Sequence, residues 1–172
     1  MADFQVLSDG AAQGLVRKLQ DTFERVSGDR LQATFGAVGA MQKLLTQGAP
    51  CELLILTRPL IMRLAQEGKV RADGIANLGM VQTGIAVKQG AAPPAIHDAD
   101  SLRAALLAAD AIYMPDPQLA TAGIHFKQVI QQLGIEETVA ARLRPLPNGY
   151  VAMAASGDAR AEMRCDSGFL PL

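Results

Sequence analysis

The chain has 172 residues, of which 49% are hydrophobic and 19% are charged, and its formal net charge is -1. This length is enough for one ordinary hydrophobic core or for two small lobes. With only 4% aromatic residues, no Trp and no excess of positive charge, the chain lacks the basic face and the stacking side chains used in nucleic-acid binding. Nucleic acid is therefore not expected among its partners.

The cysteines and the hydropathy pattern predict neither a metal site nor a membrane span. No Cys-x-x-Cys pair or His/Cys cluster accompanies Cys51 and Cys165, so we expect no structural metal and no cofactor. Cys51 precedes an apolar run and is expected to be a small core residue, with a Cys51–Cys165 disulfide as the open alternative. No apolar stretch is long enough to cross a bilayer, and the N-terminus lacks a basic segment followed by an apolar one. The sequence therefore predicts either a cytoplasmic product or one whose leader was removed.

The first half of the chain alternates strands and helices. Apolar runs at residues 4–7, 31–35 and 52–56 predict three strands, and the third is typical of a strand buried on both faces. A helix with apolar residues at helical spacing is expected after each strand. After the first strand these residues are Leu15, Val16, Leu19, Phe23 and Val26. The β-α-β-α-β-α order predicts an α/β fold with a parallel sheet and helices on both faces.

The pattern shifts after residue 77. Residues 78–81 and 84–88 are expected to be extended with no helix between them, and Asp98 or Asp100 can cap the helix that follows. A strand is expected at 111–114, then a helix ending at Gly134, a turn at residues 147–149 and a last helix over 150–155. We divide the chain into a first α/β lobe (1–80), a second α/β lobe (81–157) and a divergent C-terminal tail (158–172).

Several strands lead into loops of small residues at which a helix begins. Small residues let the backbone approach a ligand, and a helix N-terminus offers free N–H groups and partial positive charge. Such ends can bind a small anion without a charged side chain, which favours a binding protein over an enzyme. The small residues in question are Gly10, Ala11, Ala37, Val38, Gly39, Ala122 and Gly123.

Polar side chains near these loops are further candidates. Ser8 and Thr57 are hydroxyls at strand ends, where open α/β sheets bind ligands. Arg58 is the best charged candidate for clamping an anion or a carboxylate, and a solvated surface arginine is the alternative. Thr121 is expected to be a helix N-cap and Asp116 a turn residue.

Taken in order, these motifs resemble the periplasmic molybdate-binding proteins of ABC transporters and, more broadly, the type-2 periplasmic substrate-binding proteins. The resemblance covers roughly residues 4–157. The matching segments are residues 6–12, the loop 35–40 with Leu44, residues 48–50, the strand 53–57, and residues 84–87, 113–117 and 122–124.

The resemblance implies two α/β lobes joined by crossing strands, with a small oxyanion such as molybdate or tungstate held in the cleft. It implies a periplasmic location, delivery to an ABC permease, and no chemistry on the ligand. The positions that it maps to ligand contacts are Ala11, Ala37, Val38, Gly39, Thr57, Ala122, Asn148 and Gly149.

Two departures from that family bear on the ligand. The serines that hydrogen-bond the oxyanion are replaced by Ala11 and by Ala37, Val38 and Gly39. Each lost hydrogen bond to a charged ligand costs about 1.5–3 kcal/mol, so binding is expected to be weaker or to favour another anion. Residues 160–172 also do not match the segment with which such proteins return to their first lobe.

Other functions stay open at this stage. One is a cytoplasmic ligand-sensing domain of the same fold for another small anion or carboxylate, and another is a relative that has lost its ligand. A small α/β hydrolase or isomerase is a third, although no nucleophile elbow, P-loop or dinucleotide motif is present and neither His97 nor His125 has an acid at a recognisable spacing. An exposed sheet edge in the first lobe would favour a homodimer.

Overall fold

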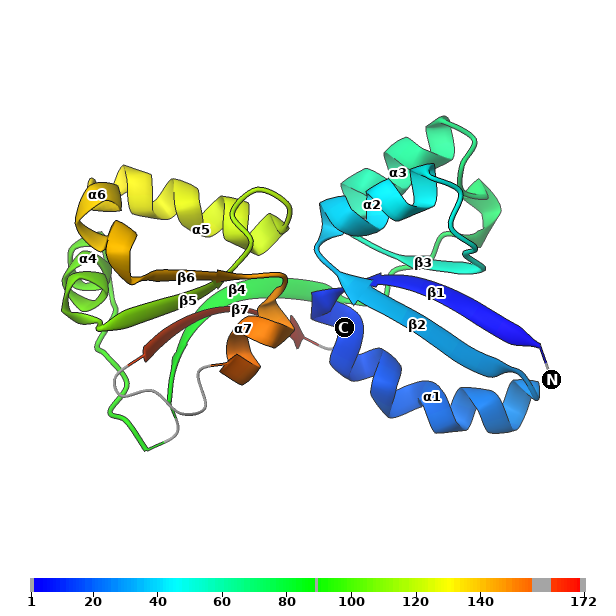
Figure 1. Ribbon diagram of the computed structural model, residues 1–172, viewed down its shortest axis with the longest axis horizontal. Coiled ribbons are helices and arrows are strands. Elements are labelled where there is room, and N and C mark those ends of the chain that lie inside the picture. The colour runs from blue at the N-terminus through cyan, green and yellow to red at the C-terminus, as the bar shows by residue number, and fades with distance from the viewer. Residues whose placement is uncertain (1, 89, 156–161, 171–172) are drawn as a thin grey trace. The chain divides into compact units, whose positions relative to one another are not determined.

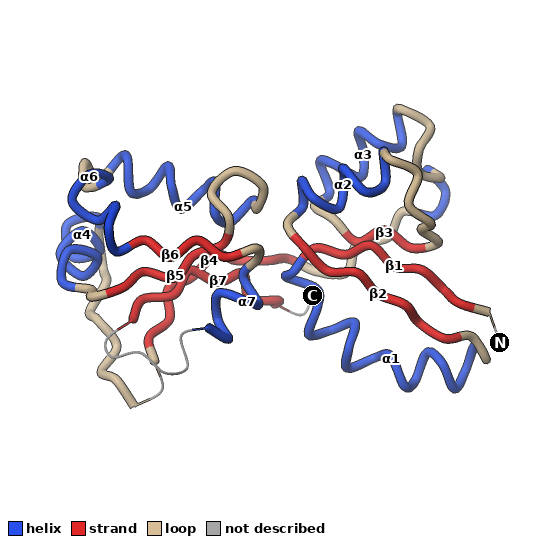
Figure 2. The backbone as a smooth tube through the Cα atoms, in the orientation of Figure 1, coloured by secondary structure: helices blue, strands red, loops and turns tan. Residues whose placement is uncertain are grey.

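The computed structural model describes residues 2–88, 90–155 and 162–170. The chain divides into two compact units (Figure 1). The first extends to Val81 and includes Phe169 and Leu170 from the end of the chain, and the second is Gln82–Gly168. Figure 2 shows that each unit contains both strands and helices, which confirms the α/β class.

The first unit is built on a three-stranded parallel sheet. Its strands are β1 (Asp3–Asp9), β2 (Arg30–Gly36) and β3 (Leu53–Ile55), in the order β2-β1-β3. Ser8 pairs with Phe35 on one side and with Ile55 on the other, and Asp9 pairs with Gly36. The carboxyl ends of the three strands therefore lie at one edge of the sheet.

Helices cover both faces of this sheet, as the sequence predicted. In Figure 1, α1 lies on one face, and α2 and α3 lie on the other. The helical elements are the short 3-10 helix η1 (Gly10–Ala12), α1 (Gln13–Ser27), α2 (Val38–Thr46), α3 (Arg58–Gln66) and the 3-10 helix η2 (Ala72–Gly74). Val6, Ala12, Val16 and Leu31 form the core, against which Phe4 and Phe23 pack with their ring centroids 5.1 Å apart.

The apolar positions of α1 and β3 are less buried than their sequence pattern suggests. The helix α1 forms as predicted, but Leu19 and Val26 in its apolar spacing are 51% and 79% exposed. The strand β3 is not buried on both faces, since Leu53 is 44% exposed and β3 pairs only with β1 at the edge of the sheet. An apolar run fits an edge strand as well as a central one, so composition alone could not separate the two.

The second unit contains a four-stranded sheet in the order β4-β7-β5-β6, in which β5 runs parallel to β6 and to β7. Its strands are β4 (Met80–Val87), β5 (Ala111–Pro115), β6 (Leu143–Leu146) and β7 (Glu162–Leu170). The two extended segments expected around residues 78–88 are one continuous strand. The strand β7 lies in the stretch described above as a tail, and its polar composition gave no strand signal.

The helices of the second unit enclose a larger core than that of the first. They are α4 (Ala99–Ala108), α5 (Thr121–Gln132), α6 (Glu136–Val139), the 3-10 helix η3 (Ala140–Arg142) and α7 (Gly149–Ala155). Leu106, Ile112 and Val139 are fully buried at its centre. Arg142 ties η3 to the end of α4, because its guanidinium donates to the carbonyl oxygens of Leu107 and Ala109 at 2.7 and 2.9 Å.

Candidate anion-binding site at the strand ends

A helical segment follows the carboxyl end of each strand of the first unit: η1 and then α1 after β1, α2 after β2, and α3 after β3. The N-cap residues of α1, α2 and α3 are Ala12, Ala37 and Thr57, and no side chain among the described residues makes a capping hydrogen bond at these three positions. The first-turn N–H groups of α2 are therefore not taken up by a side-chain cap. The turn that leads into α1 is capped by Asp9, and Pro59 in the first turn of α3 has no N–H to offer. Free first-turn N–H groups carry the partial positive charge of the helix and bind anions.

The first loop contains one hydroxyl and one carboxyl group, and both are engaged internally. Ser8 is fully buried, and its hydroxyl donates to the carbonyl oxygen of Asp9 at 3.0 Å. The Asp9 carboxylate accepts the N–H of Ala12 at 3.1 Å, and burial raises the pKa of Asp9 in spite of the hydrogen bonds from Ala12 and Ala11, which lower it. At Gly10 and Ala11 the chain therefore presents backbone beside a half-buried carboxylate.

Gln13, the first residue of α1, adds a buried polar group next to this loop. The side chain is 6% exposed, and its Oε1 atom has no hydrogen-bond partner among the described residues. Sequence reasoning named neither Asp9 nor Gln13 as a site residue. A carboxylate directly after a buried strand was the available signal for Asp9, whereas nothing in the sequence marked Gln13 as buried.

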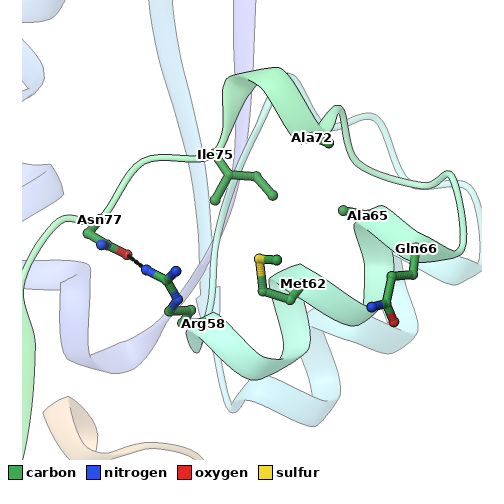
Figure 3. Close-up of a pocket in the computed structure, with 7 residues that line it drawn as sticks. All are labelled: Arg58, Met62, Ala65, Gln66, Ala72, Ile75 and Asn77. Atoms are coloured by element: carbon green, nitrogen blue, oxygen red, sulfur yellow. Dashed lines mark hydrogen bonds between the residues drawn. The ribbon is translucent and has the colours of Figure 1, made fainter.

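The second and third loops differ in their side chains. Ala37 is buried, and Val38 and Gly39 are half-buried in the first turn of α2, so this loop offers backbone only. Thr57 is half-buried and does not cap α3 through its hydroxyl. Arg58 is exposed, and its Nη1 donates to Oδ1 of Asn77 at 3.0 Å (Figure 3).

In the second unit, Gly123 has a packing role that the sequence did not suggest. A Cβ atom at this position would overlap the carbonyl oxygens of Pro115 and Asp116, so α5 can approach the end of β5 only with glycine here. Ala122 is half-buried beside it. The prediction that Thr121 is the N-cap of this helix is wrong, because the cap is Ala120 and Thr121 is already helical.

Asp116 and Asn148 both stabilise local backbone. The Asp116 carboxylate accepts the N–H groups of Gln118 and Leu119 at 2.7 and 2.9 Å, which confirms its predicted role in a turn. Asn148 is 6% exposed, and its Oδ1 accepts the N–H of Val151 at 2.9 Å at the start of α7, whose first residue, Gly149, is buried. The amide oxygen of Asn148 is therefore occupied, and any contact with a ligand would use its amide nitrogen or the backbone.

The remaining titratable candidates are the two histidines and the cysteines. His97 and His125 are exposed, and His125 lines a cavity of about 460 Å³ in the second unit together with Phe126 and Val129. Within the described residues, no three His, Cys, Asp or Glu side chains gather closely enough to hold a metal ion, and no helix is long and apolar enough to cross a bilayer. Cys51 is a half-buried free thiol whose pKa is raised by burial, and the side chain of Cys165 lies outside the described residues.

Comparison with known proteins agrees with this architecture. A curated relative, the aconitate isomerase of Pseudomonas sp, is 25% identical over 162 residues, which cover 90% of this chain and 61% of the relative. The periplasmic molybdate-binding protein of Azotobacter vinelandii superposes with a TM-score of 0.65 at 17% identity, over 98% of this chain and 79% of that protein. The sulfate-binding protein SubI of Mycobacterium tuberculosis superposes with a TM-score of 0.64 at 17% identity, over 96% of this chain and 65% of that protein.

The family is shown by a direct sequence match. The chain spans about 61% of the length of its curated relative, and the two solved structures share its fold at low identity. The model of the family described as bacterial extracellular solute-binding protein matches residues 4–168, which is nearly the whole chain. The chain therefore belongs to the bacterial extracellular solute-binding protein family.

Proposed function

We propose that the chain is the solute-binding component of an ABC transporter and that it captures a small oxyanion of the molybdate or tungstate type. The observation that carries the proposal is that a helical segment follows each of the three strand ends at one edge of a parallel sheet, and that α2 and α3 begin there without a side-chain cap. Each such end is equivalent to roughly half a positive charge near its first turn. Together they provide N–H donors and positive potential for an anion.

The choice of anion rests on the side chains at these ends. Ala37, Val38 and Gly39 supply no hydroxyl, and Ser8 already donates its hydroxyl to the chain. Thr57 is the remaining hydroxyl that we assign to the ligand. A compact anion with several acceptor oxygens suits a site made mostly of backbone N–H groups, and the similarity to molybdate-binding and sulfate-binding proteins supports this class.

The proposed contacts also include residues that have no free side-chain donor of their own or whose side chain is already bonded. They are Gly10, Ala11, Ala122, Gly123, Asn148 and Gly149. They are proposed from the family resemblance, which implies ligand contacts from both lobes. We further propose a periplasmic location and an ABC permease as partner, in line with the family. Binding and release require no chemistry on the ligand.

Isothermal titration calorimetry tests the proposal. The purified chain is titrated with molybdate, tungstate, sulfate and phosphate, and we expect tight binding of at least one of them. Ala37→Asp puts a carboxylate at the N-cap of α2, where it can accept the free N–H groups and repel the ligand. We expect the affinity to fall by about tenfold or more, which corresponds to about 1.4 kcal/mol.

Gln47→Asp is the matched control for this variant. It adds the same charge at the exposed C-cap of the same helix, away from the strand ends, and should leave the affinity within about twofold. Equal losses in both variants would show an effect of net charge and contradict the proposed site. A folded wild-type chain that binds none of the four anions would contradict the ligand class.

A second candidate function is the isomerisation of a small polycarboxylate. It is supported by the similarity to an aconitate isomerase over 90% of the chain. Adding aconitate to the calorimetry panel measures binding, and proton NMR of the same mixture follows turnover. Conversion of aconitate by the wild-type chain would favour this candidate over a transport role.

A further inference from the structure

A cavity of about 410 Å³ lies within the first unit, between α3 and the segment that contains η2 (Figure 3). Its volume is within the range of about 300–1,000 Å³ that is usual for small-molecule sites. Arg58 and Asn77 lie at one end of it, and Gln66 lies at the other. Met62 from α3 and Ile75 from the facing segment point into the space between them, so that the cavity has an apolar wall next to a cation.

A hydrogen bond holds the guanidinium of Arg58 in place, but no acidic side chain among the described residues neutralises its charge. Its Nη1 atom donates to the neutral amide of Asn77, and no ion pair to Arg58 is found among the described residues. The two acidic side chains of the neighbouring turns are engaged elsewhere. Asp73 accepts two hydrogen bonds from Arg71, at 2.7 and 3.1 Å, and Glu67 pairs with Lys69 at 3.0 Å.

The apolar wall is exposed enough to be covered by a ligand. Met62 is 42% exposed and Ile75 is half-buried, and the methyl groups of Ala65 and Ala72 continue the surface. Burying such apolar area is favourable. A fully hydrated inorganic anion cannot use this wall, whereas a carboxylate with an apolar body can.

We propose that this cavity binds a small amphipathic carboxylate, whose carboxylate pairs with Arg58 and whose apolar body packs against Met62 and Ile75. A planar guanidinium matches the geometry of a carboxylate, and the hydrogen bond to Asn77 keeps it at the end of the cavity. Among the described residues that line the cavity, Arg58 is the only charged one, which favours a ligand with a single negative charge. This site does not depend on the proposed capture of an oxyanion at the strand ends.

Methyl NMR on the chain labelled with ¹³C-methyl methionine tests the proposal. The chain has seven methionines, and Met62→Leu assigns the signal of Met62. Met41 is 4% exposed in the core of the same unit and reports on folding. The probes are benzoate, benzyl alcohol as the matched uncharged ring, and acetate as the carboxylate without an apolar body.

We expect benzoate at millimolar concentration to shift the Met62 methyl signal, and benzyl alcohol and acetate to shift it much less. Arg58→Gln should weaken the benzoate titration by about tenfold, whereas Arg63→Gln, on the same helix outside the cavity, should not change it. No shift with benzoate, or equal shifts with benzyl alcohol, would overturn the proposal.

Two further measurements keep the test decisive. If Arg58→Gln also moves the Met41 signal, a second variant, Asn77→Ala, is used. It removes the hydrogen-bond partner of the Arg58 guanidinium and keeps the charge. An unchanged benzoate affinity in Asn77→Ala would overturn the proposal that Asn77 positions Arg58. Ala37→Asp should leave the benzoate shift intact. Failure of oxyanion binding and failure of this cavity are thus observed separately.

Discussion

At the scale of single residues, Asp9 is the most unusual group at the strand ends. It follows a buried strand, accepts the N–H of Ala12, and has its pKa raised because burial outweighs these hydrogen bonds. A negative charge at this position destabilises the folded state and repels any anion nearby. Thr57 and Ala37, by comparison, leave the helix ends that follow them positive.

We predict that Asp9→Asn stabilises the chain in a manner that depends on pH. The ordinary pKa of 3.8 is raised on folding, so the native state holds the proton more tightly and wild-type stability falls as pH rises from 3.8 through the folded pKa. Asparagine keeps the acceptor for Ala12 without the charge. The gain in the free energy of unfolding should therefore be small near pH 3 and largest above the folded pKa.

Urea denaturation of both proteins between pH 3 and pH 8 checks this prediction. Asp29→Asn is a suitable control, because Asp29 also accepts a backbone N–H, that of Ala2, but at an exposed contact. A gain that grows toward low pH would contradict the assigned direction of the pKa shift.

At the scale of elements, the packing of α5 on the end of β5 depends on one glycine. The carbonyl oxygens of Pro115 and Asp116 occupy the space that a Cβ atom of Gly123 would need. Gly14 in α1 shows the opposite case, since nothing lies within 4 Å of a Cβ built there. Two helical glycines with the same intrinsic propensity thus have different structural roles.

We predict that Gly123→Ala destabilises the chain by about 1–3 kcal/mol, because the helix must move away from the strand to admit the methyl group. Gly14→Ala should instead be neutral or stabilising by up to about 1 kcal/mol, because alanine favours the helix and meets no neighbour. Urea denaturation of the two variants at one pH checks both values. Similar stability of the two variants would contradict the close approach of α5 to β5.

At the scale of the whole molecule, each compact unit has a core of its own. Val6, Val16 and Leu31 belong to the first, whereas Leu106, Ile112 and Ile130 belong to the second. The core of the second unit contains more large, fully buried side chains. Core mutations should therefore act mainly on the unit that contains them.

We predict that Leu106→Ala destabilises the second unit by about 2–5 kcal/mol, because Leu106 is fully buried. Hydrogen exchange followed by mass spectrometry should show faster exchange in peptides from residues 82–155 and little change in residues 2–81. Leu19→Ala is the control, because this side chain is 51% exposed. It should leave hydrogen exchange in both units nearly unchanged, apart from the residues next to it. Uniformly faster exchange in Leu106→Ala would indicate one cooperative unit instead.

The sequence by itself determined the α/β class and the order of the first elements, because hydrophobic periodicity and turn residues are local signals. The family followed from the resemblance of the ordered motifs to known binding proteins. The sequence also indicated that several helices begin in loops of small residues. Only the tertiary structure decided that β3 lies at a sheet edge, that β4 is continuous and that β7 pairs with β5, since pairing between distant strands leaves no local trace. The same holds for the site, because its features depend on residues brought together by folding. These features are the burial of Ser8 and Gln13, the close packing that requires Gly123, and the hydrogen bond of Arg58 to Asn77.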